Sequence, residues 1–141
     1  MVADAPTIPL TVREYGRNAG DFQEVSSWWQ GRGEVFLETL LPPLGVVIER
    51  DGEMLAALWC YESFGIGVAF IEFPCTKPGI PPGLAARALV WAENAIVTVL
   101  RARGDHKLIR AFTAPRRAQL MGRLGYQIVG QGLTSIMRRI D

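Results

Sequence analysis

The feature that most constrains the fold is a run of three strand-like segments followed by one long helical pattern. Residues 45–50 and 53–62 are apolar and strand-like, and Asp51-Gly52 between them is typical of a tight hairpin turn. A glycine-rich turn at residues 63–67 leads to a third segment, residues 68–73. Consecutive strands joined by short turns pair antiparallel, so the sequence predicts a three-stranded antiparallel meander.

The long helical pattern runs from residue 83 to about residue 103. Its apolar side chains form one broad stripe: Leu84, Ala85, Ala88, Leu89, Ala92, Ala95, Ile96, Val99 and Leu100. The preceding residues 74–82 contain four prolines and a glycine, which predict a loop. Residues 107–112 predict the next strand. A meander joined to a strand–helix–strand crossover indicates an α/β fold with a mixed, mostly antiparallel central sheet and helices on both faces.

The N-terminal part adds one strand and helical segments. Residues 10–15 alternate as a strand does. Asp21 is a suitable N-cap for a helix over residues 22–30, and Glu24 completes an approximate capping box. Residues 34–41 predict a further, less regular helical piece, and residues 1–9 a loose lead-in.

The C-terminal part contains the sequence RRAQLMGRLGY at residues 116–126. Its spacing predicts a short helix that buries Ala118, Met121 and Leu124 and ends at Gly125, because glycine can adopt the left-handed conformation that closes a helix. Residues 128–129 and 133–138 predict two final strands.

Composition limits the classes of function. The 141 residues are 49% hydrophobic and 21% charged, which fits one domain over residues 1–141. A net charge of +1 predicts no nucleic-acid partner. The apolar runs are shorter than the roughly 20 residues of a membrane span, so a cytoplasmic protein without a membrane partner is expected. Two cysteines and one histidine predict neither a disulfide framework nor a metal site.

In this order, the elements resemble the GCN5-related N-acetyltransferase (GNAT) superfamily over about residues 10–140. The C-terminal third of that superfamily is a strand, a short helix, a Leu-Gly-aromatic sequence and final strands, and Leu124-Gly125-Tyr126 matches it. The chain resembles a small, divergent bacterial or phage-type member. The resemblance implies an acyl-CoA N-acyltransferase-like fold, acetyl-CoA as co-substrate, and a small-molecule or protein amine as acceptor.

The resemblance also implies where acyl-CoA binds, at the end of the fourth strand and the start of the long helix. The superfamily's loop ends in Gly-x-Gly/Ala, which Gly83-Leu84-Ala85 matches, and a helix N-terminus favours the pyrophosphate. The implied cofactor-binding residues are Phe73, Cys75, Lys77, Gly79, Gly83, Leu84 and Ala85. Ile80 replaces the usual Arg or Gln, and Pro81 and Pro82 lack N–H donors. The alternative is therefore a rigid helix start without a ligand.

The catalytic base implied by the resemblance is a carboxylate on the fourth strand. Glu72 occupies that place and shares a strand face with Val68 and Phe70. Partial burial there would raise the pKa of Glu72. The alternative is an ion pair between Glu72 and an arginine at the sheet surface.

The superfamily's catalytic tyrosine falls on Met121, and its asparagine falls on Ala114. A thioether cannot protonate a leaving thiolate, so this general acid is missing unless Tyr126 or Tyr61 substitutes for it. His106, next to an aspartate in a predicted turn, is expected at the surface.

Tryptophans indicate a surface for association. Trp28 and Trp29 lie about 100° apart on their helix, so one is expected in the core and the other partly exposed on the acceptor side. Val90, Trp91 and Val97 lie off the main stripe of the long helix and form a second apolar face. These surfaces predict a homo-oligomer or a partner protein.

Two functions follow from the sequence. The first is an acyl-CoA-dependent N-acyltransferase that transfers an acetyl group to an amine, which Gly83-Leu84-Ala85 and the order of elements favour. The second is a non-catalytic binding or structural module of the same fold, for example in a phage or multi-protein assembly. Ile80, the loop prolines and Met121 favour this alternative.

Overall fold

The computed structural model describes residues 8–30, 36–134 and 136–140. The chain divides into two compact units, Met1–Ala111 and Phe112–Asp141. The first unit holds a sheet and the two longer helices, and the second holds the short helix α3 (Pro115–Met121). The prediction that residues 1–141 form a single domain stays a prediction.

Five strands form one sheet, and their order in the sheet follows their order in the chain. They are β1 (Leu10–Glu14), β2 (Leu44–Arg50), β3 (Glu53–Glu62), β4 (Val68–Thr76) and β5 (Leu108–Ala111). The first three pairings are antiparallel, whereas β4 and β5 run parallel. Asp51 and Gly52 close the β2–β3 hairpin with φ values of 53° and 77°. The predicted mixed, mostly antiparallel α/β fold is confirmed.

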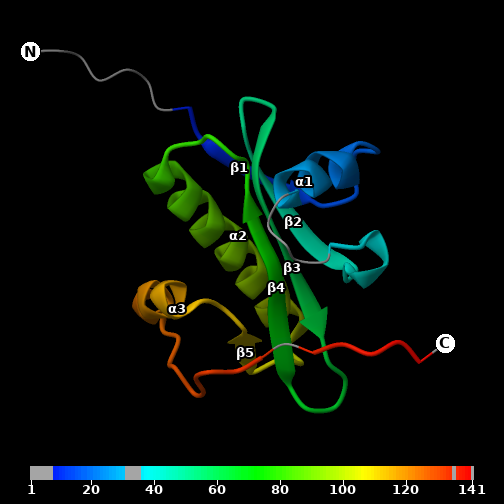
Figure 1. The fold of residues 1–141 in the computed structure, drawn as a ribbon, viewed down its shortest axis with the longest axis vertical. Helices are drawn as coiled ribbons and strands as arrows, with labels where there is room; N and C mark the ends of the chain where they lie inside the picture. Colours follow the sequence, from blue (N-terminus) through cyan, green and yellow to red (C-terminus); the bar gives the residue numbers. More distant parts are fainter. Residues whose placement is uncertain (1–7, 31–35, 135, 141) are drawn as a thin grey trace, which may run out of the picture. The chain divides into compact units, whose positions relative to one another are not determined.

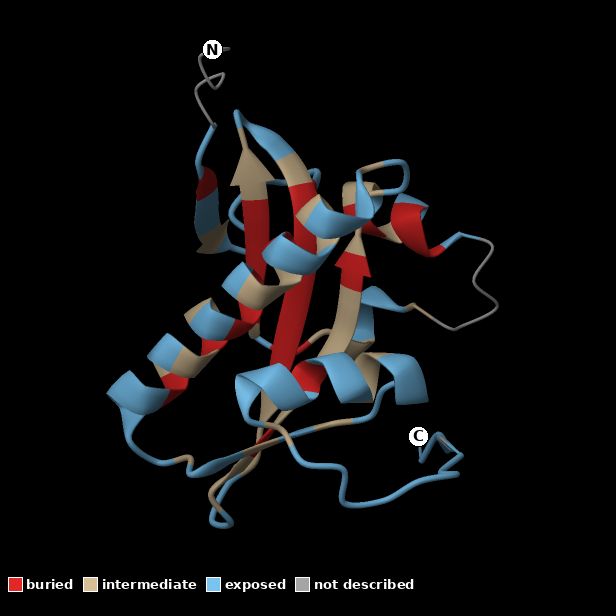
Figure 2. Cartoon of the chain, turned by 90° about the vertical axis from the view of Figure 1, so that its left-hand side faces the viewer, coloured by how far each residue is buried: buried red, intermediate tan, exposed pale blue. Residues whose placement is uncertain are grey.

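One helix lies on each side of the strands (Figure 1). Helix α2 (Pro82–Arg103) connects β4 to β5, and helix α1 (Asp21–Trp29) follows β1. Figure 2 shows buried residues in the middle strands and along one row of α2. The helical piece predicted over residues 34–41 is only a 3₁₀ turn, η1 (Glu38–Leu40), in its described part. Residues 34 and 35 lie outside the described residues.

Helix α2 buries a row of residues spaced four apart: Ala88, Ala92, Ile96 and Leu100. This row faces the sheet, as the predicted stripe requires. By length and a mean hydropathy of 1.3, α2 is also the one helix among the described residues that could cross a membrane. One row of this helix packs on the sheet, and 28% of the apolar stretch is buried in the fold. The expectations of a cytoplasmic protein and of no membrane partner stay predictions.

The face of the sheet under α1 carries an aromatic core. Its buried members are Val25, Trp28, Trp29, Val47, Ala57, Trp59 and Cys75. Trp28 and Trp29 are only 4% and 7% exposed, so the prediction that one of them forms an acceptor-side surface is wrong. The Phe36 ring stacks on Trp29 with centroids 5.1 Å apart and covers it. Gly45 lies opposite Trp59, where an added Cβ would come within 2.4 Å of the indole.

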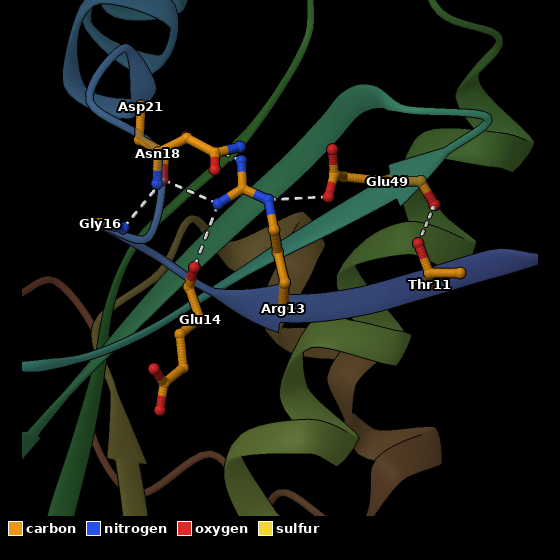
Figure 3. Close-up of polar contacts among 7 residues, drawn as sticks. All are labelled: Thr11, Arg13, Glu14, Gly16, Asn18, Asp21 and Glu49. Atoms are coloured by element: carbon orange, nitrogen blue, oxygen red, sulfur yellow. Dashed lines mark hydrogen bonds and ion pairs between the residues drawn. The ribbon is translucent and has the colours of Figure 1, made fainter.

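Asp21 anchors α1 to the sheet, and it does not cap the helix as predicted (Figure 3). Its two carboxylate oxygens each accept a 2.7 Å hydrogen bond from the guanidinium of Arg13 on β1. Arg13 Nε also donates to Glu49 on β2, at 2.7 Å. The N–H of Gly16 donates to Asp21 as well, at 2.9 Å. A strand arginine within reach of the carboxylate outcompetes the local cap, because a bidentate charge-assisted pair is stronger.

The second unit contains α3 and a 3₁₀ turn, η2 (Gly122–Leu124). The turn ends at Gly125, which has φ 92°, so the predicted helix and its glycine stop are confirmed. Met121 is buried as predicted and Ala118 is partly buried, but the predicted burial of Leu124 is wrong, because this side chain is 40% exposed. The strands predicted at residues 128–129 and 133–138 are wrong, since the described residues 126–134 and 136–140 form no strand. Alternating apolar residues form a strand only when another strand accepts their backbone hydrogen bonds.

Candidate active site

β4 pairs with β5 only over its first half. The register joins Val68 to Leu108 and Ile71 to Ala111, where β5 ends. β4 continues to Thr76. From Glu72 onward, one edge of β4 therefore has no strand partner among the described residues of the first unit. Unpaired backbone N–H and C=O groups at a strand edge can bind an extended ligand.

A β-bulge lies at the start of this unpaired stretch. Glu72 pairs with Trp59 and Cys75 pairs with Ala57, so the single residue Leu58 faces both Phe73 and Pro74. Phe73 has φ 54°, which is uncommon for a residue with a large side chain. The loop predicted over residues 74–82 thus begins three residues too early. A bulge lets a proline occupy a strand because the missing N–H falls where the ladder is already interrupted.

Aromatic packing holds Phe73 in this conformation. Its ring meets Trp29, Phe36 and Trp59 edge-on, with centroid separations of 6.1, 5.8 and 6.5 Å. Edge-to-face contacts at these distances are favourable. Aromatic contacts on the α1 face of the sheet therefore stabilise the strained backbone of the bulge. The Phe73 side chain is packed against these rings, so at the site Phe73 matters through its backbone.

Glu72, the predicted base, is half-buried on the same stretch. No described residue forms a hydrogen bond or ion pair with its carboxylate, and burial raises its pKa. The alternative of an arginine partner therefore has no support among the described residues. Burial raises the pKa of Tyr61, and the nearby charge of Glu72 raises it further. The Tyr61 hydroxyl donates to the carbonyl of Leu40.

The start of α2 offers two backbone donors. Pro82 is the first helical residue and has no N–H, while the Ala85 N–H donates to the Pro81 carbonyl at 3.0 Å. Gly83 and Leu84 lie between them, in the first turn, where an α-helix provides no acceptor. No atom lies within 4 Å of a Cβ built on Gly83, so a ligand can approach its backbone closely. Figure 1 shows this helix start connected to the far end of β4.

The other implied cofactor residues lie between the bulge and α2, with different surroundings. Lys77 Nζ forms an ion pair with Glu53 at 2.5 Å, so its charge is already partly neutralised. The Lys77 N–H donates to Leu55, which ties the loop to β3. Gly79 is exposed in a turn with φ 87°. Cys75 is only 2% exposed and packs in the aromatic core, a position that does not suit a side-chain contact with a ligand.

Comparison with solved structures identifies the fold. The chain matches N-acetylglutamate synthase from Neisseria gonorrhoeae, solved with coenzyme A and N-acetyl-glutamate, with a TM-score of 0.63 and 15% identity. The match covers 84% of this chain and only 28% of that one. An acetyltransferase of the GNAT family from Streptococcus pneumoniae matches with a TM-score of 0.56 and 12% identity, covering 94% and 98% of the two chains.

This chain has the GNAT fold. A transcriptional regulator from Bacillus halodurans also matches, with a TM-score of 0.60 and 20% identity over 92% of this chain and 100% of that one. No protein-family model matches the sequence, and no curated protein matches it either. At these identities the likeness is one of fold, and the chemistry must be argued from the residues.

Met121, on which the resemblance predicts the superfamily's tyrosine to fall, lies in α3 and is buried at 8% exposure, and Ala114 precedes the helix. The prediction that His106 lies at the surface is wrong, because its side chain is only 7% exposed. Among the described residues, no three side chains of His, Cys, Asp or Glu lie together so as to hold a metal ion.

The bulge and the Asp21 anchor were missed from the sequence. The proline directly after Phe73, in a run that otherwise alternates as a strand, was the available signal for the bulge. The pairing of Arg13 with Asp21 had no such signal, since it depends on where β1 places the arginine.

Proposed function

We propose that this chain is an acyl-CoA-dependent N-acyltransferase that transfers an acetyl group to an amine. The observation that carries the proposal is the opening of β4 beyond Ile71, with a strained bulge and a half-buried carboxylate that has no partner among the described residues. The GNAT fold supports it, because a structure of this fold was solved with coenzyme A.

The backbone supplies the binding groups. The unpaired edge of β4 offers N–H groups for the thioester carbonyl, whose oxygen gains negative charge as the amine attacks. The N–H groups of Gly83 and Leu84, with the positive end of the α2 dipole, suit the pyrophosphate. Pro81 and Pro82 remove further donors there, so we expect weaker affinity than a proline-free turn would give.

Glu72 serves as the proton acceptor. The amine nitrogen forms a bond with the acetyl carbon, its proton passes to the Glu72 carboxylate, and the carbon–sulfur bond then breaks to release the coenzyme A thiolate. A carboxylate whose pKa is raised by burial is a better base near neutral pH than an ordinary one. Met121 has no proton to give, so the thiolate takes its proton from water or from the protonated Glu72.

The test is a titration with acetyl-CoA followed by transfer assays on a panel of small amines and peptides. Glu72→Gln should lower turnover by about 100-fold or more, as loss of a general base does, and leave acetyl-CoA affinity unchanged. Glu14→Gln is the matched control, since Glu14 lies exposed on β1. Unchanged turnover in Glu72→Gln over the whole pH range would reject Glu72 as the base.

The alternative is a non-catalytic module of the GNAT fold that binds a partner within a larger assembly. Met121 in place of the tyrosine and the two prolines at the start of α2 favour it. One match of the same fold is described as a transcriptional regulator, not as a transferase. A wild-type protein that gives no heat and no thermal shift with millimolar acetyl-CoA would favour this alternative over the enzyme.

A further inference from the structure

A pocket of about 800 Å³ lies at the opposite end of β4 from the bulge. The β3–β4 turn, residues 62–67, forms one wall, and the end of α2 with the loop into β5, residues 103–108, forms the other. Figure 1 shows the turn and the start of β5 at the lower end of the sheet. Five residues of strand separate this hairpin pocket from Phe73, a distance of about 16 Å. It is therefore not part of the proposed acyl-CoA site.

His106 is the polar group that the hairpin pocket leaves unsatisfied. Its side chain is 7% exposed, and neither ring nitrogen has a hydrogen-bond partner in the described part of the chain. The nearest carboxylate oxygen, Glu62 Oε1, lies 3.9 Å from Nδ1, which is too far for a hydrogen bond. Buried imidazoles are normally satisfied, so a polar group from outside the chain is expected to lie beside this one.

The inner wall of the hairpin pocket favours a positively charged donor. Arg103 binds Oε2 of Glu62, which leaves Oε1 available as an acceptor. The Ser63 hydroxyl donates to the Val68 carbonyl, so its oxygen can still accept a hydrogen bond. Asp105 and the negative end of the α2 dipole add to the attraction for a cation. An ammonium group has several N–H donors, so it can donate both to Glu62 and to a ring nitrogen of His106.

The rim of the hairpin pocket favours two other groups. Lys107 is exposed there, and no described residue pairs with its ammonium, so it can bind a carboxylate. Phe64 and Ile66 are 97% and 67% exposed, and they offer apolar contact. A ligand that fits the wall and the rim together carries an ammonium, a carboxylate and an apolar group.

We propose that the hairpin pocket binds a free amino acid with an apolar side chain. Its ammonium lies between Glu62 and His106, its carboxylate lies near Lys107, and its side chain packs on Phe64 and Ile66. This second site goes beyond acyl transfer and does not depend on it, since no residue of the β4 opening takes part.

The 141-residue chain has one histidine, so its imidazole NMR resonances report on this pocket alone. Titration with leucine should move these resonances to saturation. Isoamylamine, which lacks the carboxylate, and isocaproate, which lacks the ammonium, should each bind about tenfold more weakly or worse. Acetyl-CoA should leave the His106 resonances in place, so this proposal and acyl transfer can fail separately.

Two variants complete the test, with thermal unfolding as the check on folding. Lys107→Met should weaken leucine binding about tenfold and leave isoamylamine binding unchanged. His106→Gln keeps a polar side chain and His106→Leu removes it, so calorimetric leucine binding should persist only in the first. The proposal is overturned if leucine, isoleucine, valine, methionine and phenylalanine all leave the His106 resonances in place. It is also overturned if isoamylamine binds as tightly as leucine.

Discussion

At the residue scale, Arg13 and Asp21 form a buried ion pair, with 2.7 Å between the guanidinium nitrogen and the carboxylate oxygen. The carboxylate is 2% exposed and accepts hydrogen bonds from Arg13 and from backbone N–H groups. Burial by itself would raise the pKa of Asp21, but these hydrogen bonds outweigh it and hold the pKa below its ordinary value. Removing one partner of a buried pair leaves the other charge uncompensated.

We expect Asp21→Asn to lower the free energy of unfolding by about 3 kcal/mol at neutral pH. Because the folded pKa of Asp21 is depressed, its stabilisation is complete above the unfolded pKa of about 4 and is lost as pH falls through the folded pKa. The difference between wild type and variant should therefore shrink between pH 5 and pH 2, on the order of these pKa values. Urea unfolding at several pH values measures it, and a difference that stays constant over this range would contradict the assignment.

At the element scale, the start of α2 is the place where we propose that the pyrophosphate binds. Gly83 has open space where a side chain would lie, and its φ is not in the left-handed region. A substitution at this position therefore tests ligand binding without disturbing the packing of the helix. The side chains of Phe73 and Cys75 are packed in the aromatic core, so a substitution there would change the folding as well as the binding.

Gly83→Glu should abolish acetyl-CoA binding, because the carboxylate fills the approach to the backbone N–H groups and repels the pyrophosphate. Gly83→Ala is the matched control and should keep affinity within about threefold, with a slightly more stable helix. Calorimetry gives both affinities. Equal binding by the two variants would mean that the pyrophosphate does not lie at α2.

At the scale of the whole molecule, the predicted second apolar face of α2 lies beside strand β1. Trp91 is 42% exposed and lines a shallow groove between α2 and β1, together with Val12, which is 41% exposed. β1 is an edge strand, so apolar side chains and an open strand edge lie beside each other. Self-association through this face stays a prediction.

We expect the wild type to be a dimer and Trp91→Glu to be a monomer in light scattering. Burying one tryptophan removes roughly 150–250 Å² from water, worth several kcal/mol per ring at about 25 cal/mol per Å², and a symmetric interface counts it twice. Thr98 also lines the groove, so Thr98→Glu serves as a milder variant of the same surface. A wild-type protein that is monomeric at high micromolar concentration would remove the basis of this prediction.

Local patterns in the sequence determined most of the secondary structure. The Asp51-Gly52 hairpin, the apolar stripe of α2 and the glycine stop at Gly125 all depend on neighbours a few residues apart, and all three are present as predicted. Backbone conformation at such positions is set by sterics and by side-chain spacing, which the sequence displays directly.

Contacts between distant residues decided the rest. Asp21 pairs with Arg13 and does not cap its helix, and both Trp28 and Trp29 are buried. His106 lines a pocket that two separate segments of the chain form. At the candidate active site, the sequence supplied Glu72 and Gly83, whereas the bulge at Phe73 appeared only when β3 and β4 were paired. Burial, strain and charge pairing are properties of the packed chain, because they depend on which residues the fold brings together.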